Sequence, residues 1–340
     1  MQPFDYIRAQ RQDEASSAVA SVSAANVAQS QWPSQFIAGG TNMVDYMRLE
    51  VARPQQLIDI SRLDPTRYGR IEAGPKGLRL GALVRMSQAE DHPDIRRDYP
   101  VIAQTLQLAA SRQIRNMATL GGNTLQRTRC SYFREASWPC NKRSPGSGCS
   151  ALEGENREHA VLGTSEHCIA TYPGDFAQAL IALDATLGIA GRKGARTLPF
   201  AELHRLPGST PHLDHVLRPD EVITFIDVPA GEWTRRSRYV KIRDRDSYQF
   251  ALTSAAVALH LDGETVVSCR IALGGVATIP WRAREAESAL QGKALSEASA
   301  AAAAQAAFSD AKPHAHNAFK IQLGKRTLIR ALLEARDMQV

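Results

Sequence analysis

The sequence predicts an α+β fold in two domains, and three observations support that prediction. The chain has 340 residues, which at about 150 residues per domain indicates two domains rather than one. Short apolar strand-like runs alternate irregularly with separate helical patterns, which is typical of α+β proteins and not of regularly wound βαβ units. The pattern of predicted strands and helices changes near residue 230, so we expect one domain over residues 1–230 and another over 231–340.

The individual elements follow from hydrophobic periodicity. In the first domain, apolar runs predict strands at 36–38, 57–60, 78–83, 186–190 and 219–229. Helical spacing predicts helices at 43–49, 100–110 and 175–185, with a surface helix over part of 14–28. In the second domain we expect strands at 238–242 and 266–273, a strand or helix at 254–260, and helices at 283–290, 300–308 and 320–335.

Composition excludes several classes of protein. The chain is 44% apolar and 22% charged, as in ordinary globular proteins. The net charge of +6 does not by itself imply nucleic acid, and the basic run 235–245 alternates with apolar residues like a solvated strand face. No stretch approaches the roughly 18 apolar residues of a membrane span. The first residues show no basic and then apolar pattern, so we expect no export signal on this chain.

Two similar glycine segments are the first candidates for a ligand site. Residues 38–42 read Ala-Gly-Gly-Thr-Asn and residues 119–124 read Thr-Leu-Gly-Gly-Asn-Thr. Adjacent glycines let the backbone adopt positive φ and approach a ligand, and successive N–H groups can converge on a phosphate. Two ordinary tight turns would use the same residues. The sequence lacks G-x-G-x-x-G and G-x-x-x-x-G-K-[ST], which disfavours a Rossmann site or a P-loop.

The cysteines are unevenly distributed. Cys130, Cys140, Cys149 and Cys168 fall in a segment of little periodicity at about 126–172, whereas Cys269 lies in an expected strand. Loops this long in a compact domain are usually functional or disordered. The spacings match no C-x-x-C pattern, so free thiols, disulfides, an iron–sulfur cluster and zinc all stay open. The cations that would offset the charge of a thiolate-ligated cluster are Arg127, Arg129, Lys142 and Arg143.

Several motifs, taken in order, resemble the FAD-binding (medium) subunits of the molybdenum hydroxylases, the family of xanthine dehydrogenase. These motifs are residues 37–42, 119–123, 173–175 and 218–223, and Lys241 with Arg243. The segments around the four clustered cysteines are similar to those of the periplasmic aldehyde oxidoreductase FAD-binding subunits within that family. They are residues 125–130, 139–143, 145–149 and 168–171.

The resemblance implies a fold and a set of cofactor residues. It implies a vanillyl-alcohol-oxidase (PCMH)-type FAD-binding domain of two subdomains, an iron–sulfur insertion at about 126–172, and a CO dehydrogenase flavoprotein-like C-terminal α+β domain. The FAD-binding residues would be Ile37, Ala38, Gly39, Gly40, Thr41, Asn42, Met43, Thr119, Gly121, Gly122, Asn123, Thr124, Asp175, Ile223 and Lys241. The backbones of both glycine segments would cradle the pyrophosphate. Asp175 would hold a polar group of FAD, with Ile223 and Lys241 near the isoalloxazine.

The same resemblance implies a [4Fe–4S] cluster on Cys130, Cys140, Cys149 and Cys168 and a role in electron transfer. Electrons from aldehyde oxidation would pass from a molybdenum-cofactor large subunit through a [2Fe–2S] small subunit to this FAD and an external acceptor. The three chains would form a heterotrimer, with no catalytic residue for the aldehyde on this chain. Co-export with a signal-bearing partner would place it in the periplasm, with the cytoplasm as the alternative. A scaffold or binding protein with structural cysteines and a stand-alone FAD oxidase are the alternative functions.

Overall fold

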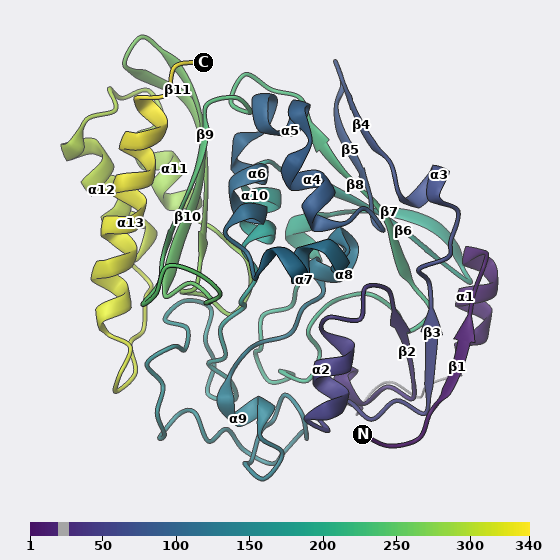
Figure 1. Ribbon diagram of the computed structural model, residues 1–340. Helices are drawn as coiled ribbons and strands as arrows, with labels where there is room; N and C mark the ends of the chain where they lie inside the picture. The colour runs from purple at the N-terminus through teal and green to yellow at the C-terminus, as the bar shows by residue number, and fades with distance from the viewer. Residues whose placement is uncertain (20–26) are drawn as a thin grey trace.

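The computed structural model describes residues 1–19 and 27–340 and contains three separate sheets with helices between and beside them (Figure 1). Part of the predicted N-terminal helix is present as α1 (Gln12–Ala18). The rest of that prediction, residues 20–26, lies outside the described residues. In the described part of the chain, no helix has both the length and the apolar character needed to cross a membrane.

The first subdomain is a small parallel sheet in the order β1-β3-β2. Its strands are β1 (Asp5–Arg8), β2 (Ser34–Ile37) and β3 (Gln56–Asp59). The carboxyl end of β2 runs into the first glycine segment, and α2 (Met43–Arg48) follows directly. Ligands in open parallel sheets bind beyond the carboxyl ends of the strands, and the first glycine segment occupies that position.

The second subdomain is an antiparallel five-stranded sheet with helices packed on it. In sheet order, its strands are β4 (Ile71–Gly74), β5 (Gly77–Gly81), β8 (Val222–Pro229), β6 (Thr186–Gly191) and β7 (Gly194–Pro199). Its helices are α3 (Pro65–Tyr68), α4 (Met86–Asp91), α5 (Pro93–Asp98), α6 (Pro100–Gln107), α7 (Arg112–Met117), α8 (Leu120–Thr124) and α10 (Phe176–Ala182).

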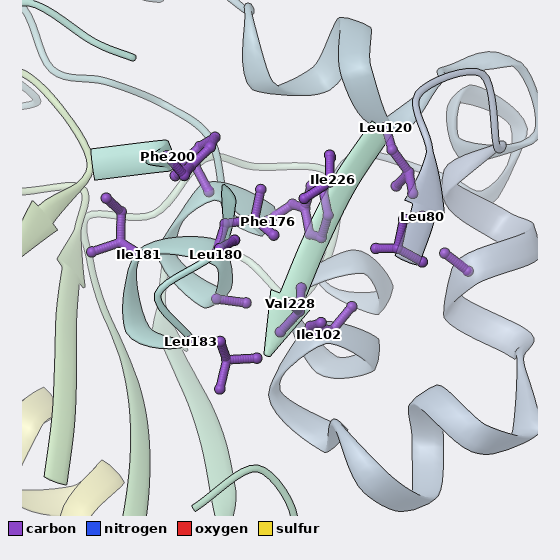
Figure 2. Close-up of a cluster of buried hydrophobic side chains, with 14 of the residues drawn as sticks. Leu80, Ile102, Leu120, Phe176, Leu180, Ile181, Leu183, Phe200, Ile226 and Val228 are labelled. Atoms are coloured by element: carbon purple, nitrogen blue, oxygen red, sulfur yellow. The ribbon is translucent and has the colours of Figure 1, made fainter. Parts of the chain in front are cut away.

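The main core lies between this sheet and the C-terminal domain. Figure 2 shows Phe176 and Leu180 of α10 beside Ile226 of β8, with Leu80 of β5 and Ile102 of α6 close by. Every residue of α10 is buried, because the helix contacts α6 on one side and strands of the C-terminal sheet on the other. A helix enclosed in this way is apolar on all sides, and α10 follows this pattern except at the buried Gln178.

The C-terminal domain is a four-stranded antiparallel sheet covered on both faces. In sheet order, its strands are β12 (Trp281–Arg282), β11 (Thr265–Gly274), β10 (Thr253–Asp262) and β9 (Ser237–Ile242). The helices on the outer face are α11 (Arg284–Leu290), α12 (Glu297–Ala307) and α13 (Phe319–Arg336), and α6 and α10 lie against the other face (Figure 1). The segment predicted as strand or helix is therefore the buried strand β10.

The cysteine-bearing insertion is mostly turns, with one short helix, α9 (Ser131–Arg134). It lies between the first subdomain and the C-terminal domain in Figure 1. Backbone N–H groups of Val161 and Tyr172 donate to the carbonyls of Val276 (2.8 Å) and Ala277 (3.0 Å). The insertion is therefore joined by backbone hydrogen bonds to the segment of the C-terminal domain that follows β11.

Two local expectations differ from the structure. The second glycine segment is not a plain turn but the one-turn helix α8, whose N-cap Thr119 accepts a hydrogen bond from the Gly122 N–H group. The basic run around β9 is a strand, as expected, but it is not simply solvated. Arg236 donates to the carbonyls of Arg336 (2.6 Å) and Met338 (2.6 Å) at the end of α13. The partners of Arg236 lie 100 and 102 positions away in the sequence, so no local pattern encodes them, whereas α8 begins at a local cap.

Candidate functional site

A cleft of about 710 Å³ lies between the two N-terminal subdomains, within the usual range for cofactor pockets. Both glycine segments line it. The predicted residues found in its lining are Ile37, Ala38, Gly39, Gly40, Thr41, Asn42, Met43, Thr119, Gly121, Gly122, Asn123, Asp175 and Ile223. Thr124 and Lys241 are not part of this lining.

The first glycine segment offers free backbone donors. Among the described residues, the N–H groups of Gly39, Gly40 and Thr41 have no hydrogen-bond partner. Gly40 has φ of 74°, a conformation that favours glycine. Successive free N–H groups on such a turn form a site for an anion such as a phosphate. This half of the predicted cradle is chemically suited to a dinucleotide.

Gly39 brings the two glycine segments together. A Cβ atom on Gly39 would lie 2.1 Å from the carbonyl oxygen of Met117 and 3.1 Å from the Cα of Ala118. No side chain therefore fits between the first segment and the residues that lead into α8. The close approach of the two backbones requires glycine at this position and closes one side of the cleft.

The second glycine segment is arranged differently from the prediction. The N–H groups of Leu120 and Gly121 donate to the carbonyls of Val84 (2.9 Å) and Ala82 (2.9 Å). Thr124 is fully buried, and its Oγ1 donates to the Gly121 carbonyl at 2.8 Å. These backbone donors are thus used within the protein. The second segment instead contributes Asn123 to the cleft lining, and the buried Oδ1 of that side chain has no partner among the described residues.

Lys241 is bound to another predicted residue, Asp175. Lys241 Nζ lies 2.8 Å from Asp175 Oδ2 and donates to the Leu108 carbonyl at 3.0 Å. The Tyr239 hydroxyl donates to Asp175 Oδ1 at 2.5 Å. Burial, with the carboxylate beside it, raises the pKa of Tyr239 well above its ordinary value. The Asp175 oxygens expected to hold FAD are therefore already paired within the protein.

Sequence reasoning did not identify Arg129 as a cleft residue. Its guanidinium lies 5.1 Å from the ring centre of Phe250 and 5.7 Å from that of Tyr46. Its Nη2 donates to Asn42 Oδ1 at 2.7 Å. Its Nε is buried, has no partner among the described residues, and belongs to a side chain that lines the cleft. Arg129 directly precedes Cys130, and that adjacency was the only signal in the sequence.

The four clustered cysteines are free thiols in the insertion. Cys140 and Cys168 are buried, and Cys140 pairs with Cys149 in a short antiparallel bridge. Burial, together with the nearby Cys140 and Cys168, raises the pKa of Cys130 to about 12. Among the described residues, no three His, Cys, Asp or Glu side chains are arranged to hold a metal ion.

Buried positive charge lies beside these thiols. Lys142 and Arg127 share the carboxylate of Asp214, with Lys142 Nζ 2.7 Å from Asp214 Oδ1. Burial lowers the pKa of Lys142, an effect that negative charge on Cys168 would oppose. Burial also lowers the pKa of Arg127 to about 10. Two cations with one carboxylate leave a net positive charge next to the cysteines.

The structure also shows the contacts of the two remaining residues considered in the sequence, Arg143 and Cys269. Arg143 binds the carbonyls of Tyr132 (2.9 Å) and Phe133 (2.7 Å), so it braces the loop that follows Cys130. Cys269 is the buried strand thiol that the sequence predicts, with its Sγ 3.6 Å from the Glu287 carbonyl.

The fold and the cleft define a protein with a cofactor-sized cavity beside free backbone N–H donors. Residues 2–231 match the FAD binding domain in molybdopterin dehydrogenase, and residues 238–335 match the CO dehydrogenase flavoprotein C-terminal domain. The chain therefore belongs to the FAD-binding subunits of the molybdenum hydroxylase family, of the aldehyde oxidoreductase and CO dehydrogenase type. It is an oxidoreductase subunit, and the predicted α+β class is confirmed.

Comparison with individual relatives supports this family assignment. The chain is 47% identical to the aldehyde oxidoreductase FAD-binding subunit PaoB of Escherichia coli K12, over 89% of this chain and 91% of PaoB. A CO dehydrogenase structure from Hydrogenophaga pseudoflava matches with a TM-score of 0.73 and 25% identity, covering 98% of this chain and 97% of that one. Quinoline 2-oxidoreductase from Pseudomonas putida 86 has the same fold, with a TM-score of 0.73 and 22% identity. The match covers 98% of this chain and 97% of that one.

Replacing Gly39 with alanine should reduce FAD content. The added Cβ would overlap the Met117 carbonyl oxygen and force the two glycine segments apart. The flavin-to-protein absorbance ratio of the purified chain measures the effect. Gly74→Ala is the matched control, because its Cβ would meet no atom within 4 Å. Full flavin content in Gly39→Ala would show that the close approach is not required.

Arg129→Gln should weaken FAD binding about tenfold to a hundredfold, the value of a hydrogen bond to a charged group. The Arg129 side chain lines the cleft, and the phosphates are the only anionic part of FAD. Titration of the apoprotein with FAD measures the dissociation constant. Arg48→Gln, an exposed change on α2, should leave that constant unchanged. Equal affinities for the two variants would contradict a role for Arg129 in FAD binding.

Proposed function

We propose that this chain is the FAD- and [4Fe–4S]-containing electron-transfer subunit of a molybdenum-dependent aldehyde oxidoreductase. Electrons would enter from [2Fe–2S] clusters of a partner and leave through FAD to an external acceptor. The observation that most supports this proposal is the adjacency of the two candidate sites. Arg129 lines the FAD cleft, and the next residue is Cys130, which belongs to the cysteine cluster.

The aldehyde is proposed as substrate class on the strength of one relative. PaoB is named an aldehyde oxidoreductase subunit and is 47% identical over 91% of its length. The CO dehydrogenase medium chain of Hydrogenophaga pseudoflava is 27% identical. The oxidation of the aldehyde would take place on the molybdenum-cofactor large subunit, with a [2Fe–2S] small subunit completing a heterotrimer. No residue of this chain is assigned to that step.

For FAD, this chain would supply binding and orientation while the cofactor accepts and releases electrons. The free N–H groups of the first glycine segment suit the pyrophosphate. Asn123 and Arg129 line the cleft, and each keeps a buried polar side-chain atom without a partner among the described residues. The bound Asp175 and Lys241 would fix the wall of the cleft rather than contact the flavin directly.

A [4Fe–4S] cluster would be held by Cys130, Cys140, Cys149 and Cys168. Each thiolate of such a cluster binds a different iron, so the ligands lie further apart than around one ion. This is consistent with four neighbouring thiols that form no single-ion site. The Ala170 N–H group donates to Cys168 Sγ at 3.5 Å, and the Lys142 and Arg127 cations would offset the negative charge of the cluster. When bound, the cluster would act as a one-electron carrier.

The compartment is also a proposal. The likeness of the cysteine segments to periplasmic aldehyde oxidoreductase subunits supports export of the folded complex by a signal-bearing partner. Cell fractionation with and without the partner subunits tests it. Recovery of the complete complex only in the cytoplasm would reject the periplasmic location.

Aldehyde should reduce the flavin of the complete complex but not that of the isolated chain. The experiment adds an aldehyde anaerobically to the complex co-purified from the native host and follows the bleaching of the flavin absorbance. The isolated flavin-loaded chain is the control, and dithionite shows that its flavin is reducible. Turnover by the isolated chain would favour a stand-alone oxidase, and a colourless complex would favour a scaffold protein.

Cys130→Ser should lower the iron content and abolish the EPR signal of the reduced cluster, because a serine hydroxyl is a poor replacement for a thiolate ligand. Iron analysis and EPR of the purified complex measure both effects. Cys269→Ser is the matched control, since Cys269 is also buried but lies in β11, outside the insertion. Unchanged iron in Cys130→Ser would refute this ligand set.

A further inference from the structure

His159 contacts one of the clustered cysteines, although the sequence analysis did not identify it. Its Nε2 lies 3.1 Å from Cys130 Sγ, well within the range of a hydrogen bond to sulfur. The side chain is buried, with 5% of its residue surface exposed. Among the four clustered cysteines, Cys130 is the one next to the FAD-cleft residue Arg129. A donor on this sulfur would act on the cluster ligand that directly follows the cleft residue Arg129 in the chain.

The backbone of His159 is held by the C-terminal domain. Its carbonyl accepts hydrogen bonds from Lys320 Nζ (3.0 Å) and Asn317 Nδ2 (3.3 Å). Its N–H group donates to the Asn156 carbonyl at 3.0 Å. Asn317 and Lys320 are themselves fully buried. The ring is therefore presented to Cys130 from a rigid support and not from a mobile loop.

The chemistry of the contact determines which group donates. A thiolate that ligates iron carries no proton, so the Cys130 sulfur can only accept a hydrogen bond. Nε2 is the ring nitrogen that lies against this sulfur. In the ligated state Nε2 therefore carries the proton and donates it to the Cys130 sulfur.

We propose that His159 is a positioning residue that donates an N–H···S hydrogen bond to the Cys130 thiolate and raises the reduction potential of the cluster. The inference rests on the proposed cluster ligation. Hydrogen bonds to ligand sulfurs stabilise the added negative charge of a reduced cluster. The donor would thus favour electron residence on the cluster beside the flavin, and His159 would tune the cluster without ligating it.

The test is an EPR-monitored redox titration of the purified holo-complex with two substitutions. His159→Leu removes the donor and should shift the midpoint potential of the cluster to a more negative value with iron content unchanged. His159→Gln places an amide N–H close to the original Nε2 and should restore a potential near that of the wild type. His167→Leu is the matched control, because His167 is exposed in the same insertion and should leave the potential unchanged.

The outcomes separate this inference from the proposed function. A wild-type complex without iron would reject the cluster itself. Full iron with an unchanged potential in His159→Leu would overturn the role of His159 and leave the cluster proposal intact. If His159→Leu loses iron, the iron content and midpoint potential of His159→Gln decide whether the donor role holds. Retained iron with a near-native potential supports the donor role, and loss of iron in both variants overturns it.

Discussion

The cleft depends on the contact between the backbones of Gly39 and Met117. A side chain on Gly39 would occupy the position of the Met117 carbonyl oxygen, so the first subdomain can approach the second this closely only without one. The two glycine segments then have different roles. The second is fixed in place because its N–H groups bind carbonyls of Ala82 and Val84. The first keeps its N–H groups free, and so it is the segment able to bind an anion.

The insertion connects this cleft to the C-terminal domain. On the cleft side, the Arg127 N–H group donates to the Tyr46 hydroxyl at 2.9 Å, and Arg129 binds Asn42. On the other side, Lys320 Nζ donates to carbonyls of the insertion. A turn-rich segment of this length would be mobile without such anchors. Because it is anchored at both ends, its four cysteines occupy fixed positions relative to the flavin cleft.

The sequence predicted those features that depend on local pattern. The amphipathic helix α13 and the strand β8 follow from periodicity, because each buries a regular set of side chains. The strand β10 was ambiguous because it is buried on both faces and so does not alternate. The resemblance located the glycine segments but not their different roles, which depend on partners distant in sequence. Likewise, Lys241 pairs with Asp175, 66 residues away, and no local pattern encodes that contact.

The buried Asp175–Lys241 pair joins three parts of the molecule. Asp175 begins α10, Lys241 lies in β9, and the Leu108 carbonyl follows α6. Burying two charges costs free energy that is recovered only when further hydrogen bonds satisfy both groups. Here Tyr239 supplies a second donor to the carboxylate, and Leu108 supplies a second acceptor for the ammonium. The arrangement therefore locks the C-terminal domain against the wall of the cleft, and a wall held rigidly lowers the ordering cost of binding a ligand.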